Sequence, residues 1–260
     1  MVEKNLYNIF YENVKKYPKR IFLSFEEKKY TYSESFSIIN QMANFLHKKG
    51  VRQGDKVIIM LGNSPEFILS VFAVFACGGV AIPINTFFKA HEAAYIIENS
   101  ESKFMISSGE FESVIEEVRL LCKNLKEIFT FDSKIDNTLN FYEHIKNMPD
   151  TPLECKASIH DLAIFIYTSG TTGHPKGAML SHYNLIENAL SCEKMLNITY
   201  KDKFLLMLPM FHTYTFTTCI ILPASLGSSI IILRSVMDMK KDSFKKILLY
   251  QRPSITLGVP

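Results

Sequence analysis

Residues 162–177 read Leu-Ala-Ile-Phe-Ile-Tyr-Thr-Ser-Gly-Thr-Thr-Gly-His-Pro-Lys-Gly, an apolar run followed by a loop rich in glycine and hydroxyl groups. The short apolar run 162–166 is typical of a buried strand. Residues 168–177 hold three glycines, four hydroxyl side chains and Lys176. This mixture suits a polyphosphate, because glycine lets backbone N–H groups approach the oxygens, hydroxyls add donors and lysine adds charge. The stretch therefore predicts a phosphate-binding loop directly after a core strand.

Two familiar phosphate-binding patterns do not fit this loop. A Walker A loop has glycine before its lysine and Ser or Thr after it, whereas Pro175 and Gly177 flank Lys176. The glycine spacing also departs from G-x-G-x-x-G. A plain turn between two strands is the alternative, although such a turn needs only about two to five residues and no lysine.

Bulk composition is that of a globular chain. The 260 residues suffice for one large domain or two smaller ones, and 47% of them are hydrophobic. The net charge is +3, with acidic and basic residues interspersed and no block of Lys or Arg. We therefore expect no nucleic-acid partner.

The cysteines indicate a reducing compartment. Five cysteines, an odd number, are widely spaced without a C-x-x-C pair: Cys77, Cys122, Cys155, Cys192 and Cys219. Free thiols are the expected state, and no metal site is expected. Since the N-terminus also lacks the apolar core of a signal peptide, we expect a cytoplasmic protein.

Two uncharged runs are long enough to cross a bilayer, at residues 67–88 and 204–233. Both are interrupted by turn residues, among them Pro83, Pro209 and Pro223. This punctuation favours buried strands and helices of ordinary length. A membrane-embedded protein is the alternative.

Strand-like and helix-like patterns alternate along the chain. Thr31 and Glu34 form a capping-box pattern, and Ser64-Pro65 is a helix start. Strands are expected at 21–25, 29–31, 57–61, 80–84, 103–107, 127–131, 162–168, 204–208, 229–233 and 254–259. Helices are expected at 5–16, 31–50, from 65, and at 89–99, 110–123, 182–196, 214–226 and 238–250.

Repeated strand–helix–strand units with continuous apolar strands predict an α/β fold with parallel sheets covered on both faces. A polar stretch at 132–160 is the expected seam between two subdomains, one at 1–160 and one beginning at 161 and running to 260. The chain stops directly after an apolar strand-like run. We therefore expect it to be the N-terminal part of a longer protein.

The loop resembles the signature of the adenylate-forming superfamily, Tyr-Thr-Ser-Gly-Thr-Thr-Gly-x-Pro-Lys-Gly, at every fixed position. That superfamily includes acyl-CoA synthetases, luciferases and the adenylation domains of peptide synthetases. The resemblance extends along the chain from about residue 5 to 260. Further similar segments are 29–32, 50–57, 63–66, 78–85, 161, 181–182 and 208–212.

The resemblance implies two layered α/β subdomains of a large N-terminal domain, truncated here. It also implies a ligase that uses ATP with Mg²⁺ to activate a carboxylic acid as an acyl-adenylate and then transfers the acyl group to coenzyme A. The flanking segments look most like those of fatty acyl-CoA synthetases. The alternatives are a relative that uses an acyl-carrier protein or an amino acid, and a non-catalytic nucleotide-binding module of the same fold.

The same resemblance implies that the ATP phosphates are bound by Thr168, Ser169, Gly170, Thr171, Thr172 and Gly173. It also implies that Lys176 is the charge partner of the β- and γ-phosphates. Lys176 and His212 are the expected catalytic residues, His212 lying between ATP and the acid. A core histidine packed beside Phe211 is the alternative for His212. For His182, after Ser181, helix capping or packing is expected.

Several elements of the family have no counterpart before Pro260. The glutamate motif that helps to bind Mg²⁺, the ribose-binding aspartate and the C-terminal domain with its lysine are absent. We therefore expect no ligase turnover from this fragment alone. The acyl chain, the acceptor thiol, the oligomeric state and peripheral membrane association stay open.

Overall fold

The computed structural model describes residues 4–131, 135–168, 175–240 and 242–258. Their strands form two sheets, each mostly parallel with one antiparallel edge strand. Sheet A has the order β12(Ile255–Thr256), β10(Lys203–Leu206), β11(Ser229–Ile232), β1(Ile21–Phe25), β2(Lys28–Thr31). Sheet B has the order β7(Leu139–Asn140), β6(Glu127–Phe131), β5(Phe104–Ser108), β3(Lys56–Ile59), β4(Val80–Pro83), β8(Leu162–Thr168), β9(Lys176–Ser181).

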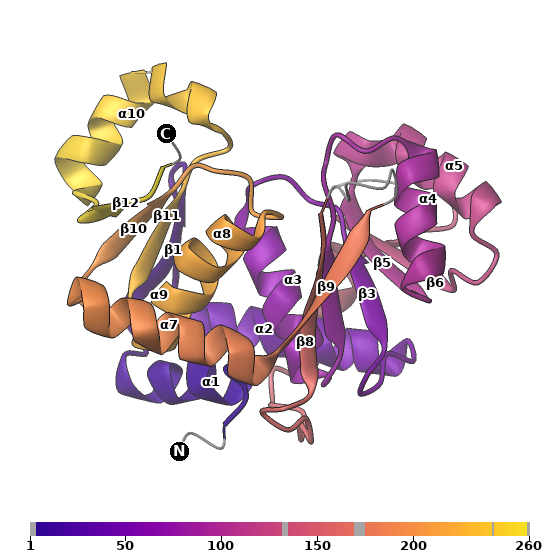
Figure 1. The fold of residues 1–260 in the computed structure, drawn as a ribbon, viewed down its shortest axis with the longest axis horizontal. Coiled ribbons are helices and arrows are strands. Elements are labelled where there is room, and N and C mark those ends of the chain that lie inside the picture. The colour runs from indigo at the N-terminus through magenta and orange to yellow at the C-terminus, as the bar shows by residue number, and fades with distance from the viewer. Residues whose placement is uncertain (1–3, 132–134, 169–174, 241, 259–260) are drawn as a thin grey trace.

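A layer of helices separates the two sheets, and further helices cover their outer faces (Figure 1). The central layer contains α1(Leu6–Lys16), α2(Tyr32–Lys48), α3(Pro65–Ala76), α7(His182–Leu196) and α9(Leu222–Leu226). Helices α4(Ala90–Asn99) and α5(Glu112–Leu121) cover sheet B, whereas α10(Asp242–Lys246) lies outside sheet A. The α/β class and the layered architecture expected from the sequence are confirmed.

Strand side chains alternate between the central and the outer layers. On β3, Val57 and Ile59 enter the central core, whereas Ile58 packs under α4 and α5. On β11, Ile230 faces the centre and Ile231 the outer layer. These strands are continuously apolar because both of their faces are buried.

Local start signals place the helices as expected. The Thr31 side chain accepts from the Glu34 N–H, and the Glu34 carboxylate accepts from the Thr31 N–H at 2.8 Å. Ser64 caps α3, with Pro65 in its first turn. Each cap satisfies N–H groups that have no partner within the helix.

The helix expected at 214–226 contains a π-helical turn, because Pro223 has no N–H to donate in the normal pattern. The stretch comprises α8(Thr213–Thr215), η2(Phe216–Ile221) and α9. The helix expected at 238–250 is similarly divided into η3(Val236–Lys240), α10 and η4(Ile247–Gln251). The polar segment 132–160 holds β7 and α6(Phe141–Ile145), and η1(Gly109–Phe111) precedes α5.

The seam expected before residue 161 does not separate the sheets. β1 pairs in parallel with β11, so sheet A takes strands from both ends of the chain. β8 pairs in parallel with β4, which brings a late strand into sheet B. Strand pairing thus crosses residue 160 in both sheets. The division into domains 1–160 and 161–260 stays a prediction.

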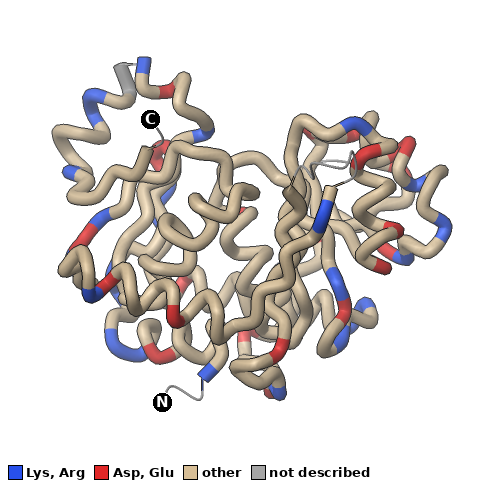
Figure 2. The backbone as a smooth tube through the Cα atoms, viewed as in Figure 1, with Lys and Arg blue, Asp and Glu red and all other residues tan. Residues whose placement is uncertain are grey.

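Charged residues of both signs lie around the outside of the fold (Figure 2). Among the described residues, Asp238 is the one Asp, Glu, Lys or Arg that is buried. The cysteines are free, and Cys77, Cys122 and Cys219 are buried. Within the described ranges, each helix is too short or too polar to span a membrane.

Candidate active site

The ends of the glycine-rich loop are held side by side by a hairpin. Strands β8 and β9 are antiparallel, and their register pairs Thr168 with Lys176. Ser169, Gly170, Thr171, Thr172 and Gly173 lie outside the described residues, so the roles expected of them stay predictions. The sequence reasoning missed β9, because Lys176 to Met179 are exposed on an edge strand and lack the apolar signal of β8.

Tyr167 supports the base of this hairpin. Its register partner is Gly177, and a Cβ atom on Gly177 would lie 3.1 Å from the Tyr167 ring. The Tyr167 hydroxyl donates to Asn99 Oδ1 on α4 at 2.7 Å. Burial raises the pKa of Tyr167, which keeps this donor protonated. Glycine at 177 therefore has a packing reason as well as its place in the loop pattern.

A cavity of about 750 Å³ lies beside this hairpin, at the carboxyl ends of β4 and β8. That edge is where ligands bind in parallel α/β sheets. Thr168, Pro175 and His212 all line it. The remaining lining residues are Pro83, Ile84, Asn85, Phe88, His91, Glu92, Tyr95, Ile166, Tyr167, Phe211 and Thr213.

His212 is exposed and precedes the first turn of α8. Its ring contacts Phe211, with the ring centroids 4.3 Å apart. The core-histidine alternative is therefore excluded, because the buried member of this pair is Phe211. The fold brings His212 to the same cavity as Thr168, although Thr168 ends a strand of sheet B and His212 follows a strand of sheet A.

Lys176 is exposed at the start of β9. The cavity lining includes its neighbour Pro175 but not Lys176, and no described residue forms an ion pair with it. Lys176 therefore lies at the base of the loop, directly after a residue of the cavity wall. The expected catalytic role of Lys176 stays a prediction.

His182 packs in the interior, as expected. It is fully buried, its ring makes an edge contact with Phe75, and its Nδ1 accepts from the Leu6 N–H at 3.4 Å. Burial lowers the pKa of His182 to about 4, although Asp161 opposes this shift. The imidazole is therefore neutral near pH 7. The cap of α7 is Ser181, which accepts from the Asn184 N–H at 3.2 Å.

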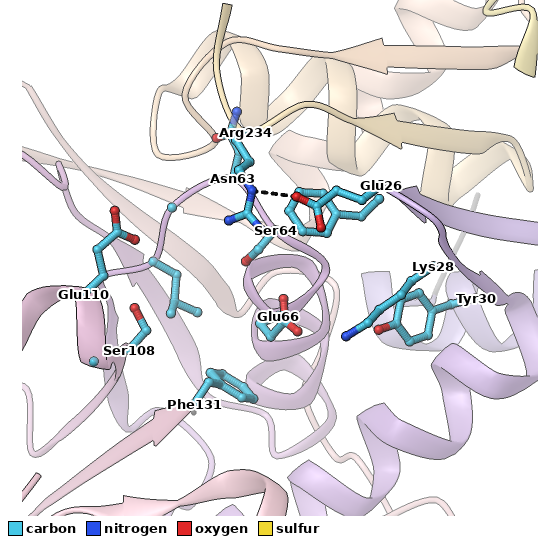
Figure 3. Close-up of a pocket in the computed structure, with 14 residues that line it drawn as sticks. Glu26, Lys28, Tyr30, Asn63, Ser64, Glu66, Ser108, Glu110, Phe131 and Arg234 are labelled. Atoms are coloured by element: carbon cyan, nitrogen blue, oxygen red, sulfur yellow. Dashed lines mark hydrogen bonds and ion pairs between the residues drawn. The ribbon is translucent and has the colours of Figure 1, made fainter. Parts of the chain in front are cut away.

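A second, more polar cavity of about 380 Å³ lies where both sheets end (Figure 3). Arg234, after β11, pairs with Glu26, after β1, at 2.8 Å, and its guanidinium lies 4.8 Å from the Phe25 ring centroid. Asn63, after β3, lines the same cavity. The sequence reasoning named neither Arg234 nor Glu26, because no local pattern marks a contact between distant strand ends.

The sequence profile of the AMP-binding enzyme family matches residues 10–260, which include the loop and every strand of both sheets. The chain belongs to the AMP-binding enzyme family. The family resemblance read from residues 167–177 is thereby confirmed.

Three CoA ligases illustrate what this member of the AMP-binding enzyme family is similar to. The crotonobetaine/carnitine–CoA ligase of Escherichia coli O17:K52:H18 is 30% identical over 78% of the chain and 40% of its own length. The long-chain-fatty-acid–CoA ligase of Bacillus subtilis is 26% identical over 98% of the chain and 51% of its own length. The anthranilate CoA ligase AuaEII, solved with anthranoyl-AMP, superposes with a TM-score of 0.91 at 25% identity, covering 98% of this chain and 50% of that one.

This AMP-binding enzyme chain thus spans about half the length of the curated relatives it matches.

Proposed function

We propose that the full-length protein is an ATP-dependent acid–thiol ligase. A carboxylate attacks the α-phosphate of ATP, which gives an acyl-adenylate and releases pyrophosphate. The thiol of coenzyme A then takes the acyl group and releases AMP. The observation that carries the proposal is the shared cavity, because Thr168 and Pro175, on either side of the glycine-rich loop, line it together with His212.

Under this proposal, residues 168–173 bind the ATP phosphates and Lys176 stabilises the charge that develops on the leaving pyrophosphate. The hairpin register supports this role, since it holds Lys176 opposite Thr168 at the base of the loop. His212 closes the cavity on the side of the carboxylate. Its exposure supports this assignment, because a reacting group must be reachable from the cavity.

Mg²⁺ accompanies ATP in the proposal. The described residues contain no group of three or more His, Cys, Asp or Glu side chains placed to hold a metal ion. We therefore assign no residue of the chain to the ion. Mg²⁺ is commonly bound through substrate phosphates together with a small number of carboxylates.

The proposed acid is a medium- or long-chain fatty acid. The likeness to the Bacillus subtilis ligase and the apolar cavity residues Ile84, Phe88 and Ile166 support it. The uncharged run 204–233 does not, because most of its large side chains pack into the protein cores. Relatives named for crotonobetaine, carnitine and anthranilate make smaller acids the competing substrates to assay.

Lys176→Met tests the proposal in the full-length protein. Loss of a charge-assisted bond worth about 1.5–3 kcal/mol predicts that acid-dependent pyrophosphate exchange into ATP falls by about 10–150-fold. The control is Lys194→Met, which removes an exposed lysine on α7 outside the cavity.

If pyrophosphate exchange is unchanged in Lys176→Met, the lysine has no role in the reaction. If the unmutated full-length protein supports no exchange with any carboxylic acid, the ligase proposal itself fails and a non-catalytic nucleotide-binding module replaces it.

A further inference from the structure

The two walls of the cavity come from different sheets. Thr168 and Pro175 belong to the β8–β9 hairpin of sheet B, whereas His212 follows β10 of sheet A. The distance between these groups therefore depends on how the two sheets are joined at their carboxyl ends. Rigid connections across that junction determine whether the groups meet a substrate together.

Asn63 makes such a connection. It follows β3 of sheet B, and its Nδ2 donates to Leu208 O at 3.0 Å and to Leu233 O at 3.1 Å. Its Oδ1 accepts from the Met210 N–H at 3.0 Å. Leu208 and Met210 follow β10, and Leu233 follows β11. One amide thus holds the ends of two neighbouring strands of the opposite sheet.

The connection leads directly to His212. Met210 is buried and lies two positions before it. The His212 N–H donates to Pro209 O at 3.2 Å, and His212 O accepts from the Phe216 N–H at 2.8 Å. The turn at residues 209–212 is therefore fixed between Asn63 on one side and the start of α8 on the other.

We propose that Asn63 is a positioning residue, which sets the place of His212 relative to Thr168 at the start of the glycine-rich loop. Only a side-chain amide of this length offers both donors and the acceptor that the three contacts need. Aspartate would keep the contact to Met210 and would direct oxygen at the carbonyl groups of Leu208 and Leu233. The inference rests on the proposed function for its kinetic test alone.

The test compares Asn63→Ala and Asn63→Asp with Asn44→Ala in the full-length protein. Asn44 is a matched control, because its side-chain amide likewise makes three contacts with the backbone: its Nδ2 donates to the carbonyl oxygens of Asn40, Pro149 and Thr151. None of these residues lines the cavity. All three variants are expected to lose thermal stability, so thermal stability does not distinguish a positioning role of Asn63 from a purely structural one.

The first deciding measurement is the NMR signal of the ¹³C-labelled His212 ring, which is independent of any enzyme activity. Both Asn63 variants are expected to shift this signal and Asn44→Ala to leave it in place. An unchanged His212 signal in a folded Asn63 variant overturns the inference, whatever the enzyme does.

The second measurement is kinetic. Misplacement of a catalytic group by about 1 Å costs up to about 100-fold in rate, so Asn63→Ala should lower kcat of pyrophosphate exchange by about 10–100-fold. KM for ATP should change far less. In a His212→Ala background the Asn63 substitution should have little further effect, because both act through one group.

Additive effects would make Asn63 a purely structural residue and overturn the inference. If His212→Ala leaves both half-reactions unaltered, the proposed role of His212 fails instead, and the ring signal alone decides whether Asn63 positions it.

Discussion

The burial of a single titratable side chain makes the stability of this protein depend on pH. His182 is the sharpest case, because its ring is fully buried and no described group accepts from or donates to its Nε2. The pKa of His182 is about 4 in the folded chain, compared with about 6.5 for an unperturbed histidine. The unfolded chain therefore takes up the proton first as the pH falls.

The prediction is a loss of stability in acid that depends on His182. Its contribution is complete above about pH 6.5 and decreases towards pH 4, by roughly 3 kcal/mol in total. Asparagine places an acceptor near the position of Nδ1 but does not titrate. The free energy of unfolding of His182→Asn, measured in urea between pH 4 and 7.5, should fall less steeply than that of the unmutated protein. Equal slopes would contradict the assignment.

At the scale of elements, the chain ends helix α9 at a residue that only glycine suits. Gly227 has φ of +82°, and a Cβ atom on it would lie 2.7 Å from Cδ2 of Tyr17. Tyr17 stacks on Tyr200 with the ring centroids 4.8 Å apart, so its ring is held in place. Both the positive φ at the end of α9 and the close packing against Tyr17 therefore require glycine at position 227.

Gly227→Ala is expected to destabilise the fold more than Gly50→Ala. Both positions have positive φ, but a Cβ atom on Gly50 meets nothing within 4 Å. The backbone strain is of similar kind, about 1–2 kcal/mol, and the contact with Tyr17 adds about 1–3 kcal/mol at Gly227. Chemical denaturation of the two variants measures the difference, and equal losses would show that the Tyr17 ring moves aside freely.

Elements were predictable where their signals are local. The caps at Thr31 and Ser64 lie within a turn of the groups they satisfy, and both were found from the sequence. Strand β9 was missed, because its pairing with β8 carries no apolar alternation of its own. The π-helical turn in Phe216–Ile221 was missed as well, since Pro223 indicates a break in the hydrogen-bond pattern without specifying its form.

At the scale of the whole molecule, contacts between the ends of the chain hold sheet A together. β11 lies between β10 and β1, so the strands after residue 200 need a strand from residues 21–25. Side chains add to this dependence. Tyr32 Oη donates to Ser228 O at 2.7 Å, and Asn13 Nδ2 donates to Ala224 O at 3.0 Å.

We therefore predict that residues 161–260, expressed alone, do not fold. The fragment lacks β1 beside β11 and β4 beside β8, which leaves the three short strands β12–β10–β11 and the hairpin β8–β9 as separate pieces without the rest of their sheets. Amide hydrogen exchange should find strong protection of β11 in residues 1–260 and none in the fragment. Addition of separately prepared residues 1–160 should restore that protection. A protected, cooperatively folded fragment would instead support an independent domain starting at residue 161.

The family, the α/β class, the helix caps and the loop pattern could all be predicted from the amino-acid sequence, because each depends on residues that are close together along the chain. The sequence also indicated Thr168 and His212 as site residues, but it did not indicate how far apart they lie. Long-range pairing in the folded chain shows that Thr168 and His212 line one cavity, that β1 lies beside β11, and that Asn63 joins the two sheets next to the turn that leads to His212. These features depend on pairing between distant segments, and hydrophobic periodicity contains no information about which buried strand lies next to which.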